Sequence, residues 1–314
     1  MSTQASLYMI QPGSQADQLD VEQVWTQIWT PNADVPLQPG YSHIVPITVR
    51  GLSYLIAVGD NGQATVFHVE NCAWPTRVDA KIDLGGTWDI IEPFVIGNNP
   101  HLLAYSAEHG QLAFFPVSDD LTLLPPYRYS RPHEPGSTAG FSVVKPITIF
   151  GAVYYLCYSS ENGTVSIYSL AVTATSPAGT PPLFSNYVWL HTWARDWTRF
   201  AFFQLGGENF FLKTNTGKLN VNIDHIQDDP SLGTVEVGTQ LELENALELD
   251  IVRPFYLGGG DPYFLTYMKD GTTTFNRFQG DCQGWRTQAR LTTVSGATQI
   301  VPIQSGDRCC VLFY

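Results

Sequence analysis

Short apolar segments, each closed by a glycine turn, recur along this chain in one pattern. A polar residue precedes two or three apolar residues, a proline, an apolar strand, a glycine, a second apolar strand and a glycine turn. Four copies keep the whole pattern: SHIVPITVRGLSYLIAVGDNG from Ser42, DIIEPFVIGNNPHLLAYSAEHG from Asp89, SVVKPITIFGAVYYLCYSSENG from Ser142 and DIVRPFYLGGGDPYFLTYMKDG from Asp250. A copy from Asp196 lacks the proline, and TQIVPIQSGDRCCVLFY, from Thr298, runs to the last residue. Such self-similarity predicts a fold built from equivalent units.

The repeat has the length of a four-stranded propeller blade. Its marker positions, the prolines and their counterpart in the incomplete copy, lie 47 to 54 residues apart: Pro46, Pro93, Pro146, Phe200, Pro254 and Pro302. A third β-rich segment follows each glycine turn, as in QATVFHV, and a looser fourth segment comes next, as in TRVDAKIDL. Proline cannot donate to a ladder, so its position suits an innermost strand with a free inner edge. The strands are apolar on both faces, as blades packed face to face require.

The two ends of the chain complete each other. The sixth copy supplies two strands up to Tyr314, and the N-terminus offers SLYMIQ from Ser6 and VEQVWTQIW from Val21. These four strands can share one blade, which closes the ring and removes open sheet edges; an open solenoid is the alternative. We predict an all-β fold, a single-domain six-bladed β-propeller over residues 1–314. The expected blades are residues 39–84, 85–135, 136–190, 191–245, 246–294, and 295–314 together with 1–38.

Composition and charge restrict the partners. Charged residues make up only 14% of the chain, and the net charge is −13. A surface this negative repels phosphate and anionic lipid, so we expect neither nucleic-acid nor membrane partners. The chain has no apolar run of 18 residues and no signal-peptide pattern at its start, which predicts a cytoplasmic protein. The five cysteines include no C-x-x-C pair, which predicts reduced thiols rather than a disulfide framework or a zinc site.

Candidate chemistry has to be sought outside the standard motifs. The sequence has no GxSxG, HExxH, Walker, EF-hand or dinucleotide-binding pattern, and its seven histidines show no metal-ligand spacing. We therefore expect no metal and no cofactor. Equivalent positions in a propeller form rings around the axis, so they can be compared across the repeats. The residue four before each marker is always small and polar, which predicts hydrogen bonds to the backbone: Ser42, Asp89, Ser142, Asp196, Asp250 and Thr298.

Two further rings are uneven, which predicts one asymmetric pocket at a mouth of the channel. The position five before the marker holds Tyr41, Trp88, Phe141, Arg195, Leu249 and Ala297, and the position directly before it holds Val45, Glu92, Lys145, Arg199, Arg253 and Val301. The predicted substrate-binding residues are Tyr41, His43, Trp88, Phe141 and Trp197. The predicted catalytic residues, donors to a ligand oxygen, are Arg195, Arg199, Arg253 and Lys145. A solvated channel with ion pairs and tryptophans packed between blades is the alternative.

Two protein families resemble this chain. The fungal fucose-specific lectins resemble it in repeat number and length, but their Arg, Glu and aromatic triple does not recur in these repeats. The chain also resembles the propeller hetero-Diels–Alderases of fungal tropolone-sesquiterpenoid pathways, in length, in an aromatic content of 13%, and in W-D-x-x-x-P-F with L-L-x-Y between Trp88 and Tyr105. This second resemblance implies a role in secondary metabolism, in which a quinone methide adds to a strained terpene alkene.

We therefore predict a small-molecule-binding propeller with one apolar or aromatic ligand in a central pocket. The expected activity is that of a cofactor-independent biosynthetic cyclase or pericyclase of the hetero-Diels–Alder type. A cycloaddition requires a pocket that holds two partners together and a donor that polarises a carbonyl. A sugar-binding lectin and a protein-interaction propeller are the alternatives. The sequence leaves the ligand and the oligomeric state open.

Overall fold

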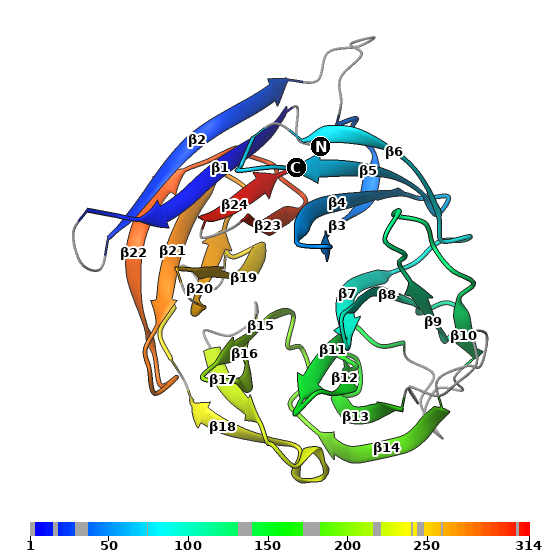
Figure 1. Cartoon of the computed structure of the whole chain (residues 1–314). Coiled ribbons are helices and arrows are strands. Elements are labelled where there is room, and N and C mark those ends of the chain that lie inside the picture. Colours follow the sequence, from blue (N-terminus) through cyan, green and yellow to red (C-terminus); the bar gives the residue numbers. More distant parts are fainter. Residues whose placement is uncertain are drawn as a thin grey trace.

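Six sheets surround a central axis (Figure 1). The computed structural model describes residues 4–14, 18–28, 37–73, 75–130, 140–171, 183–215, 221–239, 241–243, 248–258, 260–305 and 308–314. Within these ranges each sheet has four antiparallel strands, and helical structure is limited to a short 3-10 turn, η1 (Pro230–Leu232). No helix there is long and apolar enough to cross a membrane. The predicted all-β six-bladed propeller is confirmed.

The innermost strand of every blade carries the marker residue, and the following strands step outward. Blade 1 contains β3 (Tyr41–Val49), β4 (Leu52–Gly59), β5 (Gln63–Val69) and β6 (Thr76–Asp83). Blade 2 contains β7 (Ile90–Ile96), β8 (Asn99–Ser106), β9 (Gln111–Pro116) and β10 (Tyr127–Ser130). Blade 3 contains β11 (Val143–Ile149), β12 (Ala152–Tyr158), β13 (Thr164–Ala171) and β14 (Leu183–Thr192).

The second half of the ring repeats this order. Blade 4 contains β15 (Arg199–Leu205), β16 (Glu208–Thr214), β17 (Val221–Ile226) and β18 (Thr234–Gly238). Blade 5 contains β19 (Ile251–Leu257), β20 (Asp261–Tyr267), β21 (Thr272–Phe278) and β22 (Trp285–Thr292). Blade 6 contains β23 (Ile300–Ser305), β24 (Arg308–Phe313), β1 (Gln4–Pro12) and β2 (Leu19–Ile28).

Blade 6 joins the two ends of the chain, as predicted. Strand β1 pairs with β24 from Ser6 opposite Phe313 to Ile10 opposite Cys309. Its outer edge pairs with β2, so the order is β2-β1-β24-β23. The ring is therefore closed by main-chain hydrogen bonds between residues that are some 300 positions apart in the sequence.

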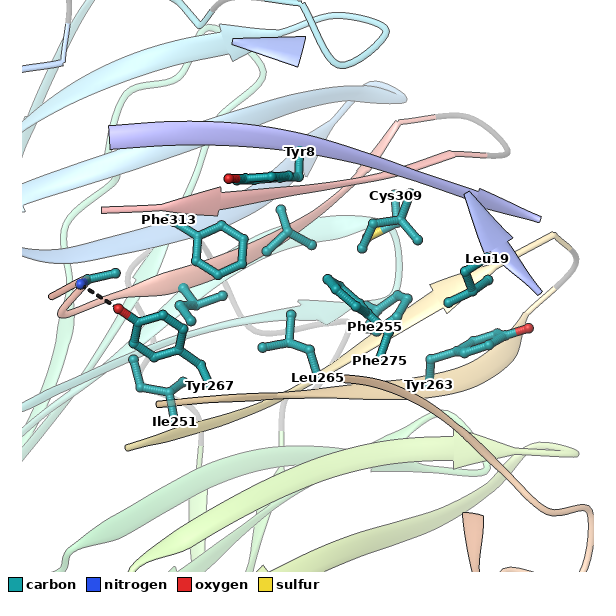
Figure 2. Packing of buried hydrophobic residues seen from close by; sticks show 14 of the residues in the cluster. Tyr8, Leu19, Ile251, Phe255, Tyr263, Leu265, Tyr267, Phe275, Cys309 and Phe313 are labelled. Carbon is teal, nitrogen blue, oxygen red and sulfur yellow. Dashed lines mark hydrogen bonds between the residues drawn. The ribbon is translucent and has the colours of Figure 1, made fainter. Parts of the chain in front are cut away.

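The core consists of six apolar clusters, one between each pair of neighbouring blades. Figure 2 shows the cluster between blades 5 and 6. The Tyr8 ring meets the edge of Phe313, with 5.2 Å between centroids and 72° between planes. Strands that are apolar on both faces thus form a sandwich with each neighbour, which explains the absence of the polar alternation seen in half-exposed sheets.

Four tyrosines fasten one blade to the start of the next. Each lies at the end of the second strand, and its hydroxyl accepts a hydrogen bond from the backbone N–H of the following blade. The pairs are Tyr105 with Phe141 at 2.9 Å, Tyr158 with Trp197 at 3.3 Å, Tyr267 with Ala297 at 2.8 Å and Tyr314 with Tyr41 at 2.9 Å. The Tyr267 bond is the dashed line in Figure 2.

The ring of small polar residues has the predicted structural role in five blades. The hydroxyls of Ser42, Ser142 and Thr298 donate to carbonyls of the second strand of their own blades. The carboxylates of Asp89 and Asp250 accept from the N–H groups of Ala107 and Lys269 at 2.7 Å.

Blade 4 lies two residues out of the expected phase. Phe202 pairs with Phe211, as Pro93 pairs with Leu102 and Pro254 with Phe264. The marker is therefore Phe202 and not Phe200, and Thr198 takes the place assigned to Asp196. The equivalent of Arg253 is then Ala201. The reason is the turn: Gly206 follows Thr198 by eight residues, as Gly97 follows Asp89. A slip of two residues keeps the side chains on the same face but changes their depth in the channel.

The expectation of reduced thiols throughout is wrong. Cys72, in the loop after β5, forms a disulfide with Cys310 on β24. The other three cysteines, Cys157, Cys282 and Cys309, are free and buried. The bond joins blade 1 to blade 6, beside the place where the chain ends meet.

Candidate functional site

A central cavity of about 590 Å³ lies on the axis, walled by the first half of the six innermost strands. Every blade contributes residues from the stretch between its small polar residue and its marker residue. The repeat therefore builds the site directly, since equivalent positions of the six strands converge on the axis. The volume lies within the range of small-molecule pockets.

An ion pair spans the wall between blades 2 and 3. Lys145 Nζ lies 2.5 Å from Glu92 Oε2, and both side chains are 28% exposed. The two residues are equivalent in the repeat, so the pair forms between neighbours in the ring that precedes the markers. Each charge is compensated by the other, which leaves little of Lys145 for a ligand.

Arg199 also bridges two blades. Its Nε donates to the carbonyl of Asp250 in blade 5 at 2.5 Å, and its Nη1 donates to the carbonyl of Thr198 at 3.1 Å. His43 and Gln299 make the same kind of bridge, since the first donates to Trp88 O at 2.7 Å and the second to Tyr41 O at 2.9 Å. Arg199, His43 and Gln299 are equivalent positions, directly after the small polar residue, so three members of this ring each join their own blade to the next one.

Arg253 stands apart from these pairs. Its Nη1 donates to the carbonyl of Val252 at 3.1 Å, and no described carboxylate lies within ion-pair distance of its guanidinium. The residue is exposed to the cavity, and the cavity walls around it remove part of its hydration. This desolvation lowers the pKa of Arg253; Glu92 acts in the opposite direction, and Arg199 adds to the lowering. Arginine nevertheless stays protonated. The guanidinium therefore brings a positive charge into the cavity, and it has further N–H groups that can donate to a ligand.

His43 adds an uncharged donor and acceptor. Burial lowers its pKa, although the carboxylates of Glu92 and Asp89 oppose that change. The ring is therefore neutral at pH 7. Because Trp88 O can only accept, Nε2 carries the proton, and Nδ1 is left as an acceptor.

Aromatic carbon covers the blade 4 side of the cavity. Phe200 and Phe202 both line it, and their rings are stacked with 6.0 Å between centroids and 17° between planes. Ile90, Val143 and Ile251 complete the apolar part. Blades 4 and 5 thus contribute both arginines and apolar side chains to the same cavity.

The structure brings together four of the nine predicted site residues. His43, Lys145, Arg199 and Arg253 line the cavity. Trp88 and Trp197 are each only 6% exposed and pack between blades. Tyr41 and Phe141 pack against the inter-blade clusters, and Arg195 is exposed outside the cavity. The predicted aromatic ring at the mouth is therefore an inter-blade position. Its members in the corrected phase each belong to a different cluster: Tyr41, Trp88, Phe141, Trp197, Leu249 and Ala297.

Sequence comparison missed the phenylalanine pair and Gln299. Phe202 was missed because the repeat in blade 4 was aligned two residues too early. The spacing of eight residues between the small polar residue and the turn glycine, seen between Asp89 and Gly97, would have given the correct alignment. Gln299 follows Thr298 directly, as His43 follows Ser42, so the pattern of the bridging ring was present in the sequence. Among the described residues, no three His, Cys, Asp or Glu side chains are grouped to hold a metal ion.

Comparisons with solved structures support the propeller architecture. A candidate 6-phosphogluconolactonase from Bacteroides fragilis is similar with a TM-score of 0.55 and 14% identity, over 95% of this chain and 85% of that chain. The periplasmic gluconolactonase from Pseudomonas aeruginosa is similar with a TM-score of 0.55 and 12% identity, over 95% and 86%. At such identities the similarity shows the fold alone. No protein-family model and no curated protein sequence matches the chain.

Proposed function

We propose that this protein is a small-molecule-binding propeller that takes one organic ligand in its central cavity and acts on it as a cyclase of the hetero-Diels–Alder type. The observation that carries the proposal is Arg253, a guanidinium that is exposed to the cavity and has no described carboxylate partner, in the same cavity as the stacked pair of Phe200 and Phe202. A cation confined in this way favours a ligand oxygen that carries or gains negative charge.

The cavity supports this class of reaction in two ways. The phenylalanine pair gives an apolar surface against which two flat or hydrocarbon partners can be held, and such confinement replaces part of the entropic cost of their encounter. Arg253 would donate to a quinone-methide carbonyl, whose oxygen gains negative charge as the new bonds form. Arg199 would assist from nearer the mouth while keeping its bridge to Asp250.

The stereochemical outcome of a model reaction tests the proposal. An ortho-quinone methide released from a protected phenol in the presence of an alkene gives a racemic product in water. We expect the wild type to give an enantiomeric excess and Arg253→Gln to give a nearly racemic product. Arg195→Gln is the matched control, because Arg195 is an exposed arginine outside the cavity. A racemic product with the folded wild type, or equal selectivity in both variants, contradicts the proposal.

Lactone hydrolysis is the second candidate, favoured by His43. A neutral imidazole with a free acceptor nitrogen, in the same cavity as Arg253, could activate water while the arginine binds the developing oxyanion. The similar folds include a gluconolactonase. Under this alternative, acid release from gluconolactone is expected to be faster than the spontaneous rate and to depend on His43. A rate equal to the spontaneous one excludes the alternative for this substrate.

A further inference from the structure

A second pocket, of about 270 Å³, lies at the other end of the channel. It is walled by the innermost strands of blades 2 to 5, mainly from the marker positions onward, and by Asn209, Phe210 and Ile226 of the next two strands of blade 4. Pro93, Lys145 and Phe202 line both this pocket and the central cavity, so the two spaces adjoin. The volume is room for roughly nine water molecules, or for a group of one or two fused rings.

The wall of this pocket is mainly apolar, and five of its fourteen lining residues are aromatic side chains held in place by their neighbours. It contains Phe94, Phe202, Phe203, Phe210 and Tyr256. The Phe203 ring is stacked on Phe210 at 5.6 Å between centroids. It is also stacked on Phe278, behind the wall, at 3.8 Å. Rings fixed by such contacts lose little conformational freedom when a ligand arrives, which favours binding.

The polar groups of the pocket are already hydrogen-bonded to the protein. Gln204 Nε2 donates to Asn209 Oδ1 at 3.0 Å, and Asn209 Nδ2 donates to Thr148 O at 2.9 Å. The Tyr256 hydroxyl accepts from Gln204 N at 2.7 Å, and burial raises the pKa of this phenol, which keeps it neutral. Lys145, the one cation among the lining residues, is paired with Glu92. A charged ligand would therefore find no unpaired opposite charge here.

We propose that this pocket is a second ligand site, which binds a neutral aromatic or fused-ring compound. This proposal does not depend on which reaction, if any, takes place in the central cavity. The pocket differs from that cavity because its described lining residues include no unpaired cation, and the side-chain amides of Gln204 and Asn209 and the Tyr256 hydroxyl are already hydrogen-bonded to the protein.

The test uses Prodan, a neutral naphthalene dye whose emission shifts to shorter wavelength in apolar surroundings. Thr148 is exposed and lines the pocket, and Thr48 is the equivalent exposed residue of blade 1, outside it. Thr148→Glu places a carboxylate at the pocket and keeps the backbone carbonyl that binds Asn209. We expect about a tenfold or greater loss of Prodan affinity in Thr148→Glu. Thr48→Glu and Arg253→Gln should bind Prodan like the wild type.

The proposal is overturned if the wild type does not shift the emission, if Thr148→Glu binds Prodan like the wild type, if Thr48→Glu loses as much affinity as Thr148→Glu, or if the loss occurs in Arg253→Gln alone. The last result would place the dye in the central cavity, so it separates this site from the proposed function. Near-UV circular dichroism checks the fold of each variant. Val95→Glu, at a pocket residue that is 49% exposed, repeats the test, with Leu52→Glu, at 48%, as its control.

Discussion

At the scale of single residues, the chemistry of a side chain is decided by its depth along the innermost strand. Arg195, before the strand, is exposed, while Arg199, at its start, bridges to the next blade. Arg253, deeper in, has no described carboxylate partner and is the candidate for ligand contact. The three arginines that the sequence placed in one group thus have three roles: Arg195 is a surface residue, Arg199 joins two blades, and Arg253 is the candidate donor to a ligand.

A buried charge cluster in blade 4 lies beside Trp193 and Trp197. Lys213 is 1% exposed, and its Nζ lies 2.8 Å from Asp224 Oδ2 and 4.6 Å from the centre of the Trp193 ring. Glu236 lies 3.3 Å from the same nitrogen but is half exposed. Trp193 and Trp197 therefore enclose a cation of the protein itself, which explains these aromatics without a ligand.

This cluster predicts an unusual pH dependence. Burial raises the pKa of Asp224 from 3.8 to about 6, although Lys213 opposes the shift. Between these values the folded state keeps a proton that the unfolded chain has lost. The contribution of Asp224 to the free energy of unfolding therefore falls as pH rises through that window, on the order of 1 kcal/mol per pH unit. Urea unfolding of the wild type and Asp224→Asn from pH 4 to pH 7 measures it. If the wild type gains stability relative to the variant as pH rises, the Lys213 attraction outweighs burial.

At the scale of strands, the spacing of the repeats and the composition of each segment were sufficient to predict the six blades. They were not sufficient to align the residues of every blade with those of the others. The strands were identified because apolar runs alternate with glycine turns, and both depend only on local residues. The phase of blade 4 was misassigned because the other five markers are prolines, whereas this blade has Phe202 in that position and offers no proline to align. The site was predicted only in part because the depth of a side chain depends on that register. Of the arginines proposed from the sequence, two reach the cavity.

A recurring tyrosine at the end of the second strand was available in the sequence and was not used. It appears in LLAYS, YLCYS, FLTYM and VLFY, at Tyr105, Tyr158, Tyr267 and Tyr314. Each hydroxyl fixes the start of the following blade. The backbone N–H that donates to this hydroxyl belongs to the position five before the marker, which had been assigned to the ligand pocket from the sequence. The tyrosine therefore identifies that position as a structural one.

The tyrosine bridge predicts a measurable loss of stability. Tyr267 accepts from Ala297 N at 2.8 Å and donates to Val294 O at 2.9 Å, in buried surroundings. Tyr267→Phe leaves both backbone groups without this partner, which should lower the free energy of unfolding by about 1–3 kcal/mol. Tyr154→Phe is the control, because the Tyr154 hydroxyl makes no hydrogen bond to a described residue. Equal chemical-unfolding midpoints for the two variants would show that the bridge contributes nothing.

At the scale of the whole molecule, the ring is fastened twice where its ends meet. Strand β1 pairs with β24 by hydrogen bonds, and the Cys72–Cys310 disulfide joins blade 1 to the same strand. The pairing could be predicted because both ends of the chain carry incomplete repeats. The disulfide could not, because its cysteines are 238 residues apart and meet only after the ring has closed. A loop that long gives a disulfide a large effect on the unfolded chain in the entropic account, about 5 kcal/mol.

The closing strand itself predicts how the ring fails. Ala5, Leu7 and Ile10 of β1 are fully buried, and Tyr8 packs on Phe313. Each large side chain contributes about 1.5–3 kcal/mol by burial, so the strand accounts for a substantial part of a typical stability of 5–15 kcal/mol. Removal of residues 1–12 would also leave the edges of β24 and β2 unpaired. We expect this truncated chain to be insoluble, as a sedimentation assay after expression would show. A circular permutant that carries residues 1–38 after Tyr314 through a linker keeps every strand, and it should stay soluble and unfold cooperatively. A soluble truncated chain with a cooperative transition would mean that the five complete blades hold the fold without the closing strand.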